Sequence, residues 1–323
     1  MWIMRQAGRY LPQYRRLREG VDFLTLCRTP ELAAEVTLLP VDVLGVDAAI
    51  QFADILLPLP AMGAELRFVP GVGPSLPQPV RGADDLHRLS VPDVGDTLGY
   101  VFEALRETRR RLSGRVPLIG FGGTPWTLAA YLVEGGPSKS FAHLLGWSYR
   151  DAAGLGRLLD LLAETSAAYL AGQVEAGAQA IQLFDTWGGL LDRRRWRRLA
   201  RPAVEKILAA LRPRGVPLLY YIRGGAHLLP ELAELPIDVL SVDWRLPLDE
   251  VRRIVGPRLV LQGNLDPAAL LGSPAEVRRE TRRVMEVGRG GGHIVNLGHG
   301  ILPMTPVENA RAFVDAVRSA TRG

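Results

Sequence analysis

The chain has 323 residues, 47% of them hydrophobic, and carries a formal net charge of +5 at pH 7. This length allows one large domain or two, and the apolar content is ample for a large core. No apolar run reaches the roughly 20 residues of a membrane-spanning helix, and early arginines interrupt any signal peptide. Cys27 is the only cysteine, which excludes an internal disulfide and a cysteine-rich zinc site. These properties predict a cytoplasmic protein.

Residues 4–10, with the sequence MRQAGRY, place Arg5 and Arg9 four positions apart around Ala7 and Gly8. Small residues between the arginines let a ligand come close to the backbone. Two planar guanidinium groups can each bind a carboxylate through paired hydrogen bonds. The segment therefore indicates a ligand with more than one acidic group. Taken alone, it is better explained as solvated surface, because the chain is rich in arginine throughout.

Short strand-like runs recur along the chain, and each is followed by a helical pattern. This alternation predicts an α/β protein with a parallel sheet, and eight units is the number that closes a (β/α)8 barrel. We expect a single TIM-type barrel domain over residues 1–323, with an extra β-hairpin near residues 65–80, where residues 65–69 and 77–80 flank a Gly/Pro-rich turn. The eight expected strands are Trp2–Met4, Ala48–Phe52, Pro117–Phe121, Ala180–Phe184, Leu218–Ile222, Val239–Val242, Leu259–Leu261 and His293–Leu297.

Capping signals predict where two helices begin and end. Thr124 and Pro125 are typical of an N-cap and a first helical position, and Gly135 of a helix end. Another helix is expected to begin at residues 29–31, with the sequence TPE, and Pro40 is expected to kink or end it.

Polar residues gather where the expected strands end, which in this barrel class is the catalytic face. Asp54 is the most informative, because it follows an apolar strand and has Phe52, Ile55 and Leu56 around it. A carboxylate in such surroundings needs hydrogen-bond donors. Asp54 would find them either by capping the next helix or by meeting N–H groups of a ligand, and its position alone favours neither. Three other polar residues at strand ends are assigned to helix capping or to support of the site. They are Arg223, Asp243 and Asp266.

The densest basic run is residues 193–198, with the sequence RRRWRR. An aromatic residue among positive charges would suit nucleic acid. However, the run leads into a helical pattern that Pro202 would kink or restart. A solvated helical face is the better explanation, and no nucleic-acid partner is expected. The turn at residues 122–124 opens a helix and is a weak candidate for an anion site.

The sequence predicts no metal site. None of the five histidines is paired with another at the spacing of ligands on one helix. His293 and His299 lie on one strand and its exit, but six positions apart is not a familiar chelating distance. A hydrogen-bonding role is the better explanation for one of them.

Six segments together resemble the uroporphyrinogen decarboxylase family. They occur in the family's order over nearly the whole chain, which makes the resemblance far more specific than one motif. The family usually has further residues before the arginine segment, and its position of Thr186 can hold a serine. The segments are MRQAGRY at 4–10, FADIL at 52–56, TPWTLAAYLVEGG at 124–136, QLFDTWG at 182–188, QGNLDP at 262–267 and NLGHG at 296–300.

The resemblance implies a cofactor-free carboxy-lyase on a (β/α)8 barrel, a homodimer with no metal and no membrane partner. It would remove the four acetate carboxyls of uroporphyrinogen III in haem biosynthesis, releasing four CO2 and leaving coproporphyrinogen III. The essential carboxylate corresponds to Asp54. The implied substrate-binding positions are Arg5, Gln6, Ala7, Gly8, Arg9, Arg18, Phe52, Asp54, Tyr131, Thr186 and His299.

Chemistry agrees with such a substrate. A porphyrinogen has carboxylates around its edge, which suit Arg5 and Arg9, and pyrrole N–H donors at its centre, which suit Asp54. A pyrrole protonated at a ring carbon is its own electron sink, and Asp54 would stabilise that cation. The proton donor is an open question. Arg5 is one candidate, although a guanidinium pKa above about 12 makes a poor general acid. Tyr131 and His299 are expected to bind substrate by donating hydrogen bonds.

Two alternatives differ in class. A corrinoid-linked methyltransferase shares the superfamily fold, but it uses zinc held by Cys and His ligands, which this chain is poorly equipped to supply. A non-catalytic tetrapyrrole-binding protein would be favoured by loss of Asp54 or of the arginine segment, and both are present.

Overall fold

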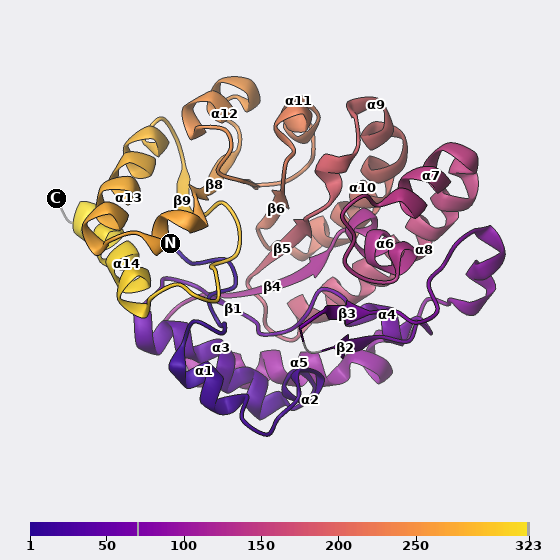
Figure 1. The fold of residues 1–323 in the computed structure, drawn as a ribbon, viewed down its shortest axis with the longest axis horizontal. Helices are drawn as coiled ribbons and strands as arrows, with labels where there is room; N and C mark the ends of the chain where they lie inside the picture. The colour runs from indigo at the N-terminus through magenta and orange to yellow at the C-terminus, as the bar shows by residue number, and fades with distance from the viewer. Residues whose placement is uncertain (70, 322–323) are drawn as a thin grey trace.

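The computed structural model describes residues 1–69 and 71–321. Seven parallel strands form one curled sheet in the order β1-β4-β5-β6-β7-β8-β9, and helices cover its outside (Figure 1). This arrangement confirms the expected α/β barrel class. The strands of this sheet are β1 (Ala49–Ile50), β4 (Leu118–Gly123), β5 (Ala180–Asp185), β6 (Leu218–Ile222), β7 (Val239–Val242), β8 (Val260–Leu265) and β9 (His293–Leu297).

The prediction of a strand at Trp2–Met4 is wrong, although the segment takes the place that an eighth strand would occupy. The backbone N–H of Trp2 donates to Val295 of β9 at 3.3 Å, and the N–H of Asp47, just before β1, donates to the carbonyl of Met1 at 2.9 Å. The N–H of Met4 donates instead to the side chain of Asn296. Because side chains replace part of the backbone ladder, the segment closes the sheet without forming a strand.

The helices lie between the strands and after β9. The α-helices are α1 (Pro12–Leu17), α2 (Phe23–Arg28), α3 (Pro30–Leu44), α4 (Pro58–Ala61), α5 (Val94–Leu112), α6 (Pro125–Glu134), α7 (Ala142–Arg150), α8 (Ala152–Glu175), α9 (Arg193–Arg195), α10 (Arg201–Leu211), α11 (Leu229–Leu232), α12 (Leu248–Val255), α13 (Pro274–Gly288) and α14 (Val307–Thr321). Short 3-10 helices are η1 (Ala83–Arg88), η2 (Gly188–Leu190), η4 (Arg212–Arg214), η5 (Ala226–Leu228) and η6 (Pro267–Leu271), and η3 (Trp196–Ala200) is a π-helix.

The predicted helix ends are confirmed at α6. The Thr124 side chain accepts a hydrogen bond from the N–H of Thr127, and Gly135 takes a left-handed conformation, φ 85°, that glycine adopts without steric cost. Helix α3 begins at Pro30 as expected, but Pro40 does not end it, since the helix continues to Leu44.

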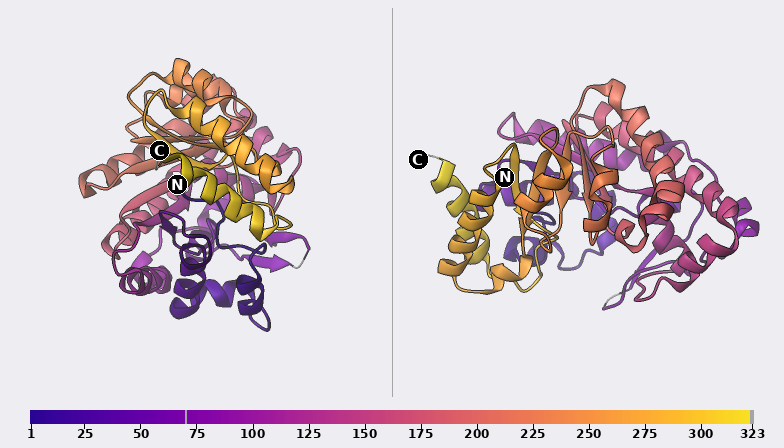
Figure 2. Two further views of the ribbon diagram at one scale, coloured as in Figure 1. Left: turned by 90° about the vertical axis from the view of Figure 1, so that its left-hand side faces the viewer. Right: turned by 90° about the horizontal axis from the view of Figure 1, so that it is seen from above.

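A two-stranded hairpin of β2 (Arg67–Val69) and β3 (Gly73–Ser75) lies outside the main sheet, as expected (Figure 2, right). Its second strand comes earlier than predicted. Residues 77–80 run instead beside the end of α6, where the N–H groups of Leu76 and Val80 donate to carbonyls of Gly135 and Leu132. These bonds join the hairpin to the helix that carries Tyr131.

Two hydrophobic clusters hold the fold together. The larger one lies between the sheet and its helices. The smaller one fills the inside of the sheet and includes Trp2, Met4, Ile50, Ile119 and Tyr221. Inward side chains of neighbouring strands therefore form a packed plug, which puts any cavity at the ends of the strands. Among the described residues, no helix is long and apolar enough to cross a membrane.

Candidate active site

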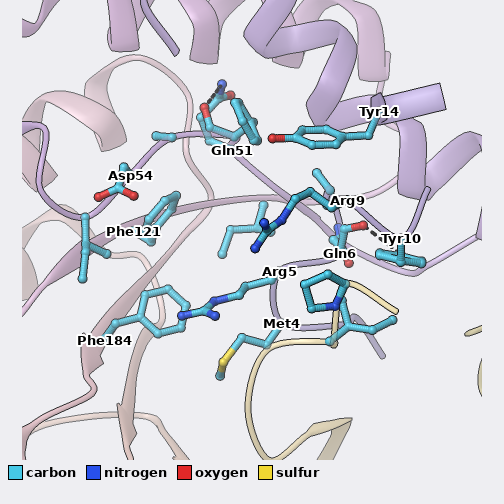
Figure 3. A pocket seen from close by; sticks show the side chains of 18 of the residues that line it. Met4, Arg5, Gln6, Arg9, Tyr10, Tyr14, Gln51, Asp54, Phe121 and Phe184 are labelled. Atoms are coloured by element: carbon cyan, nitrogen blue, oxygen red, sulfur yellow. Dashed lines mark hydrogen bonds between the residues drawn. The ribbon is translucent and has the colours of Figure 1, made fainter. Parts of the chain in front are cut away.

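A cavity of about 300 Å³ opens at the carboxyl ends of β1, β4 and β5. Arg5 and Arg9, from the arginine segment, and Asp54, which follows β1, point into it (Figure 3). Of the predicted site residues, those that line the cavity are Arg5, Gln6, Ala7, Gly8, Arg9, Phe52, Asp54, Thr186 and His299.

Arg5 is held in an uncommon conformation. Its φ of 62° is left-handed, which costs a non-glycine residue about 1–2 kcal/mol. A Cβ at Gly300 would collide with the Arg5 side chain, so the glycine makes room for it. No described residue pairs with the guanidinium of Arg5 or of Arg9, since neither occurs among the ion pairs or side-chain hydrogen bonds formed within residues 1–69 and 71–321. Both groups are therefore left to bind a ligand.

Gln6, between these arginines, is fully buried and bonds to the protein itself. Its amide accepts from the N–H of Ile3 at 3.0 Å and donates to the carbonyl of Ala48 at 3.0 Å. The hydroxyl of Tyr10 donates to the backbone carbonyl of Gln6 at 2.8 Å. Gln6 thus fixes the arginine segment against Ala48, the residue before β1. Both polar groups of its side-chain amide already have hydrogen-bond partners within the protein.

Asp54 is half-buried at the cavity wall. One carboxylate oxygen accepts a hydrogen bond from the N–H of Leu56 at 2.8 Å. Helix α4 begins later, at Pro58, so Asp54 closes a turn and does not cap that helix. Burial raises the pKa of the Asp54 carboxyl above its ordinary value, while the Leu56 N–H and the charge of Arg5 oppose this. A desolvated carboxylate of this kind attracts N–H donors or a cation.

Aromatic rings from successive strands form the floor of the cavity. Phe121 meets Phe184 edge-on, with centroids 5.6 Å apart, and Phe184 meets Tyr221 at 5.9 Å. The imidazole of His299 stacks on Tyr221, again at 5.9 Å. Phe121 and Phe184 line the cavity, so these edge-to-face rings make part of its surface apolar.

Two predicted residues do not line the cavity. Arg18 donates to the carbonyl of Val21 at 2.9 Å, and its guanidinium lies 5.8 Å from the ring centre of Phe23, which does line it. Tyr131 packs near Trp187, with centroids 6.4 Å apart. Burial raises the pKa of Tyr131, and the charges of Asp54 and Arg5 are close enough to affect it. Both residues stand just behind the wall.

Asp185 is a buried carboxylate whose role the sequence did not indicate. It accepts hydrogen bonds from the hydroxyls of Thr124 at 2.6 Å, Thr127 at 2.9 Å and Tyr220. The N–H of Trp187 donates to Thr127, so this network fixes the turn that presents Thr186. Because the protein's own carboxylate lies at the start of α6, the anion site considered at residues 122–124 is not supported. A polar residue ending a strand was the only sequence signal.

The residues assigned to support act as expected in two cases. Asp266 accepts from the N–H of Ala268 at 2.9 Å and caps η6. Asp243 accepts from the backbone and side chain of Arg245. Arg223 has no ion-pair partner among the described residues, and its guanidinium lies 5.7 Å from the Trp187 ring centre.

The basic run at 193–198 is only partly a solvated face. Arg193 and Arg197 bind the buried carboxylate of Glu231. Arg195 binds Asp192 and lies over the ring of Tyr149. Helix α10 restarts at Arg201, with Pro202 in its first turn, as predicted.

Comparison with known proteins agrees with this geometry. The profile of the family described as "Uroporphyrinogen decarboxylase (URO-D)" matches residues 1–320. The chain belongs to the uroporphyrinogen decarboxylase family. A uroporphyrinogen decarboxylase from Syntrophotalea carbinolica is 49% identical, covering 100% of this chain and 94% of the relative. One from Hydrogenovibrio crunogenus is 47% identical, covering 98% and 91%.

A solved structure described as a methyltransferase from Methanosarcina mazei has a similar fold. It superposes with a TM-score of 0.81 at 25% identity, covering 95% of this chain and 91% of that one. The shared fold therefore extends to enzymes with a different activity, and the cavity has to decide between activities.

Proposed function

We propose that this protein decarboxylates the four acetate side chains of uroporphyrinogen III, releasing four CO2 and leaving coproporphyrinogen III, without an added cofactor. The observation that carries the proposal is the pairing of two unpartnered guanidiniums with one desolvated carboxylate across a cavity floored by aromatic rings. The arginines suit the carboxylates at the edge of the tetrapyrrole, Asp54 suits the N–H groups at its centre, and the aromatic side chains suit its apolar carbon framework.

In each step the substrate supplies its own electron sink. A proton added to a pyrrole carbon makes the ring a cation, and the bond from the methylene to the carboxylate breaks to release CO2. The electron pair moves into the ring. A second proton then converts the methylene to a methyl group, while the ring carbon loses the first. Asp54 stabilises the cation, and Arg5 and Arg9 hold the acidic side chains. Arg5 stays a candidate proton donor.

The remaining assignments also belong to the proposal. Thr186 and His299 line the cavity and contact the substrate, and Phe52 shapes the cavity edge. Tyr131 and Arg18, which lie behind the wall, reach the substrate only if the wall adjusts when it binds. The chain works as a single barrel domain, as a homodimer and in the cytoplasm. Light scattering on the purified protein would test the dimer, since a monomeric mass at working concentration contradicts it.

The decisive experiment incubates the purified protein with reduced uroporphyrinogen and no cofactor, and separates products by carboxylate number. Products with seven to four carboxylates support the enzyme. Binding without any loss of carboxylates would instead favour a tetrapyrrole-binding protein.

Asp54→Asn tests the mechanism, because asparagine can still accept the Leu56 hydrogen bond. We expect kcat to fall about 10²–10³-fold, while the free energy of unfolding at neutral pH rises, since a desolvated charge is removed. Asp266→Asn is the matched control at a capping residue. Near wild-type turnover by Asp54→Asn would refute the role of Asp54.

The methyltransferase alternative has weaker support. Cys27 is buried within α2, and within residues 1–69 and 71–321 there is no group of three His, Cys, Asp or Glu side chains able to hold a metal. A donor set for a thiol-activating zinc is therefore not assembled near the cavity.

A further inference from the structure

Tyr221 joins the cavity floor to His299 through two short contacts. Its hydroxyl oxygen lies 3.0 Å from the carbonyl oxygen of Gly298 and 2.8 Å from Nδ1 of His299. The two rings stack with an interplanar angle of 14°. Tyr221 is fully buried on β6, whereas His299 lines the cavity. The orientation of the imidazole is therefore set from below by one phenol.

Proton counting assigns the donors when both contacts are taken as hydrogen bonds. A carbonyl oxygen can only accept, so the 3.0 Å contact with Gly298 requires the single hydroxyl proton of Tyr221. The 2.8 Å contact with His299 must then use a proton of the imidazole, and Nδ1–H donates to the phenol oxygen. In a neutral imidazole with Nδ1 protonated, Nε2 carries a lone pair.

The surroundings of His299 favour this neutral form. Nε2, the ring nitrogen that Tyr221 does not contact, has no hydrogen-bond partner among the described residues, and His299 lines the cavity. The charged groups that act on the ring are Arg5, Arg223 and Arg245. Burial and these guanidiniums lower the pKa of His299 to about 3.

We propose that Tyr221 is a positioning residue that holds His299 in the Nδ1–H tautomer, so that Nε2 accepts a hydrogen bond from an N–H group of the tetrapyrrole. This rests on the proposed function and changes the expectation that His299 donates. A lone pair repels a carboxylate oxygen. The neutral His299 and the carboxylate of Asp54 are thus the hydrogen-bond acceptors of the cavity, whereas the guanidiniums of Arg5 and Arg9 bind acidic groups.

The proposal is tested by long-range proton–nitrogen correlation spectra of the protein labelled with ¹⁵N-histidine. His299→Gln identifies the signals of His299. At neutral pH we expect a protonated Nδ1 and a bare Nε2. A protonated Nε2 in the wild-type spectrum would overturn the proposal whether or not the protein is a decarboxylase.

Tyr221→Phe removes the acceptor for Nδ1–H without changing the ring. We expect the Nε2–H tautomer to become the major form and kcat/KM to fall about 10-fold, the effect of one neutral hydrogen bond. Tyr220→Phe is the matched control, since it deletes the neighbouring hydroxyl that binds Asp185. It should lower stability and leave the His299 signals unchanged. An unchanged tautomer in Tyr221→Phe would contradict the positioning role.

A ligand titration tests the acceptor. Reduced coproporphyrinogen, kept under anaerobic conditions, should shift the Nε2 signal to lower frequency without adding a proton to it. A new Nε2–H signal on binding would mean that His299 donates, and the proposal would fail.

Discussion

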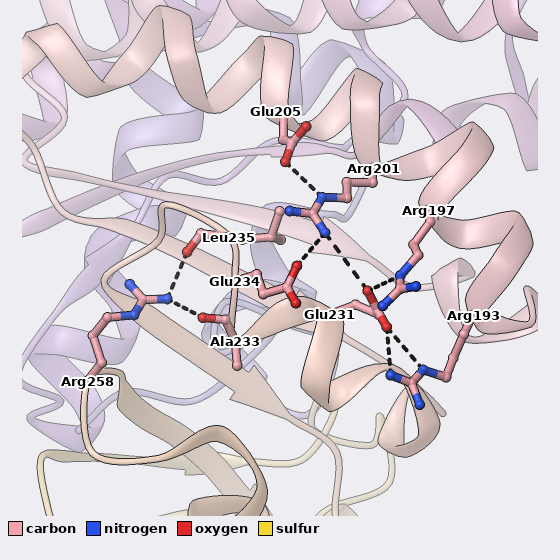
Figure 4. A network of polar contacts seen from close by, with 9 residues as sticks. All are labelled: Arg193, Arg197, Arg201, Glu205, Glu231, Ala233, Glu234, Leu235 and Arg258. Carbon is pink, nitrogen blue, oxygen red and sulfur yellow. Dashed lines mark hydrogen bonds and ion pairs between the residues drawn. The ribbon is translucent and has the colours of Figure 1, made fainter.

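Two groups of arginines in this chain differ in what faces them. In the Glu231 cluster, made of Arg193, Arg197, Arg201 and Glu231, three guanidiniums surround one carboxylate (Figure 4). Glu231 is fully buried, while Arg193 and Arg197 are about half exposed. At the cavity, Arg5 and Arg9 point into the same space as the carboxylate of Asp54, and neither forms an ion pair with any described residue.

The difference distinguishes arginines that stabilise the fold from arginines that are free to bind a ligand. The cluster ties α9 and η3, which follow β5, to α11, which follows β6, and it compensates its own buried anion. The cavity arginines leave their hydrogen-bonding capacity unused, and Arg5 is also held in a strained conformation. Identical side chains thus serve stability where a carboxylate of the chain meets them, and binding where a ligand must supply it.

The sharpest test of the comparison is Arg5→Gln. We expect kcat/KM for uroporphyrinogen to fall about 10²-fold, because charge-assisted hydrogen bonds to a carboxylate are lost. The free energy of unfolding should change by no more than about 0.5 kcal/mol, since no partner is left unpaired. Steady-state kinetics and urea unfolding measure the two effects. Unfolding at much lower urea would place Arg5 with the structural group.

Glu231→Gln should have the opposite profile. Three guanidiniums lose their anion, so the free energy of unfolding is expected to fall by about 1–3 kcal/mol. At 25 °C kcat/KM should stay within about twofold of the wild type, because the cluster lies outside the cavity. A large loss of activity in the folded variant would show that the cluster shapes the site.

As the pH falls through the acid range, Glu231 and Asp54 change the free energy of unfolding in opposite directions. The guanidiniums of Arg197 and Arg193 hold the pKa of Glu231 below its ordinary 4.5. Its stabilisation is present above that value and is lost as the pH falls through the lower folded pKa. The pKa of Asp54 is raised above 3.8, so its contribution is favourable at low pH and is lost as the pH rises.

Urea unfolding between about pH 5 and pH 3 measures this difference. Over that range Glu231→Gln should lose less stability than the wild type, and Asp54→Asn should lose more. Parallel curves for all three proteins would contradict both pKa directions.

The smallest effect is expected for Arg194→Gln. Arg194 lies in the same basic run as the cluster, but it is exposed and has no ion pair among the described residues. Activity should match the wild type, and unfolding should shift by less than about 0.5 kcal/mol. Poorer stability or turnover would show that charge density alone matters in this run.

Local signals in the sequence predicted most of the fold. Seven strands and the limits of α6 follow from apolar runs and capping residues, which act over a few positions. Trp2–Met4 was placed correctly but is not a strand, because its partner is the side chain of Asn296, which is distant in sequence. Pro40 was expected to kink or end its helix, and the helix continues past it to Leu44.

The sequence predicted where the site lies and many of its residues, but not the hydrogen bonds between them. Strand ends located Asp54, Thr186 and His299 at one face, and the family resemblance selected them. The hydrogen bonds could not be foreseen. Asp185 depends on three hydroxyls from α6 with its N-cap and from β6, and the tautomer of His299 depends on Tyr221. Such contacts join residues 35 to 78 positions apart, so no short window of sequence contains both partners.

The segment that closes the sheet has a consequence for how the protein matures. The indole of Trp2 donates to Gln262, and the N–H of Met4 to Asn296, across separations of 260 and 292 residues. During synthesis the arginines leave the ribosome long before the strands that order them. Arg5 and Arg9 are therefore synthesised first, but they reach their binding positions last. A nascent chain of this protein can hold most of its barrel and still have nothing to grip its substrate with.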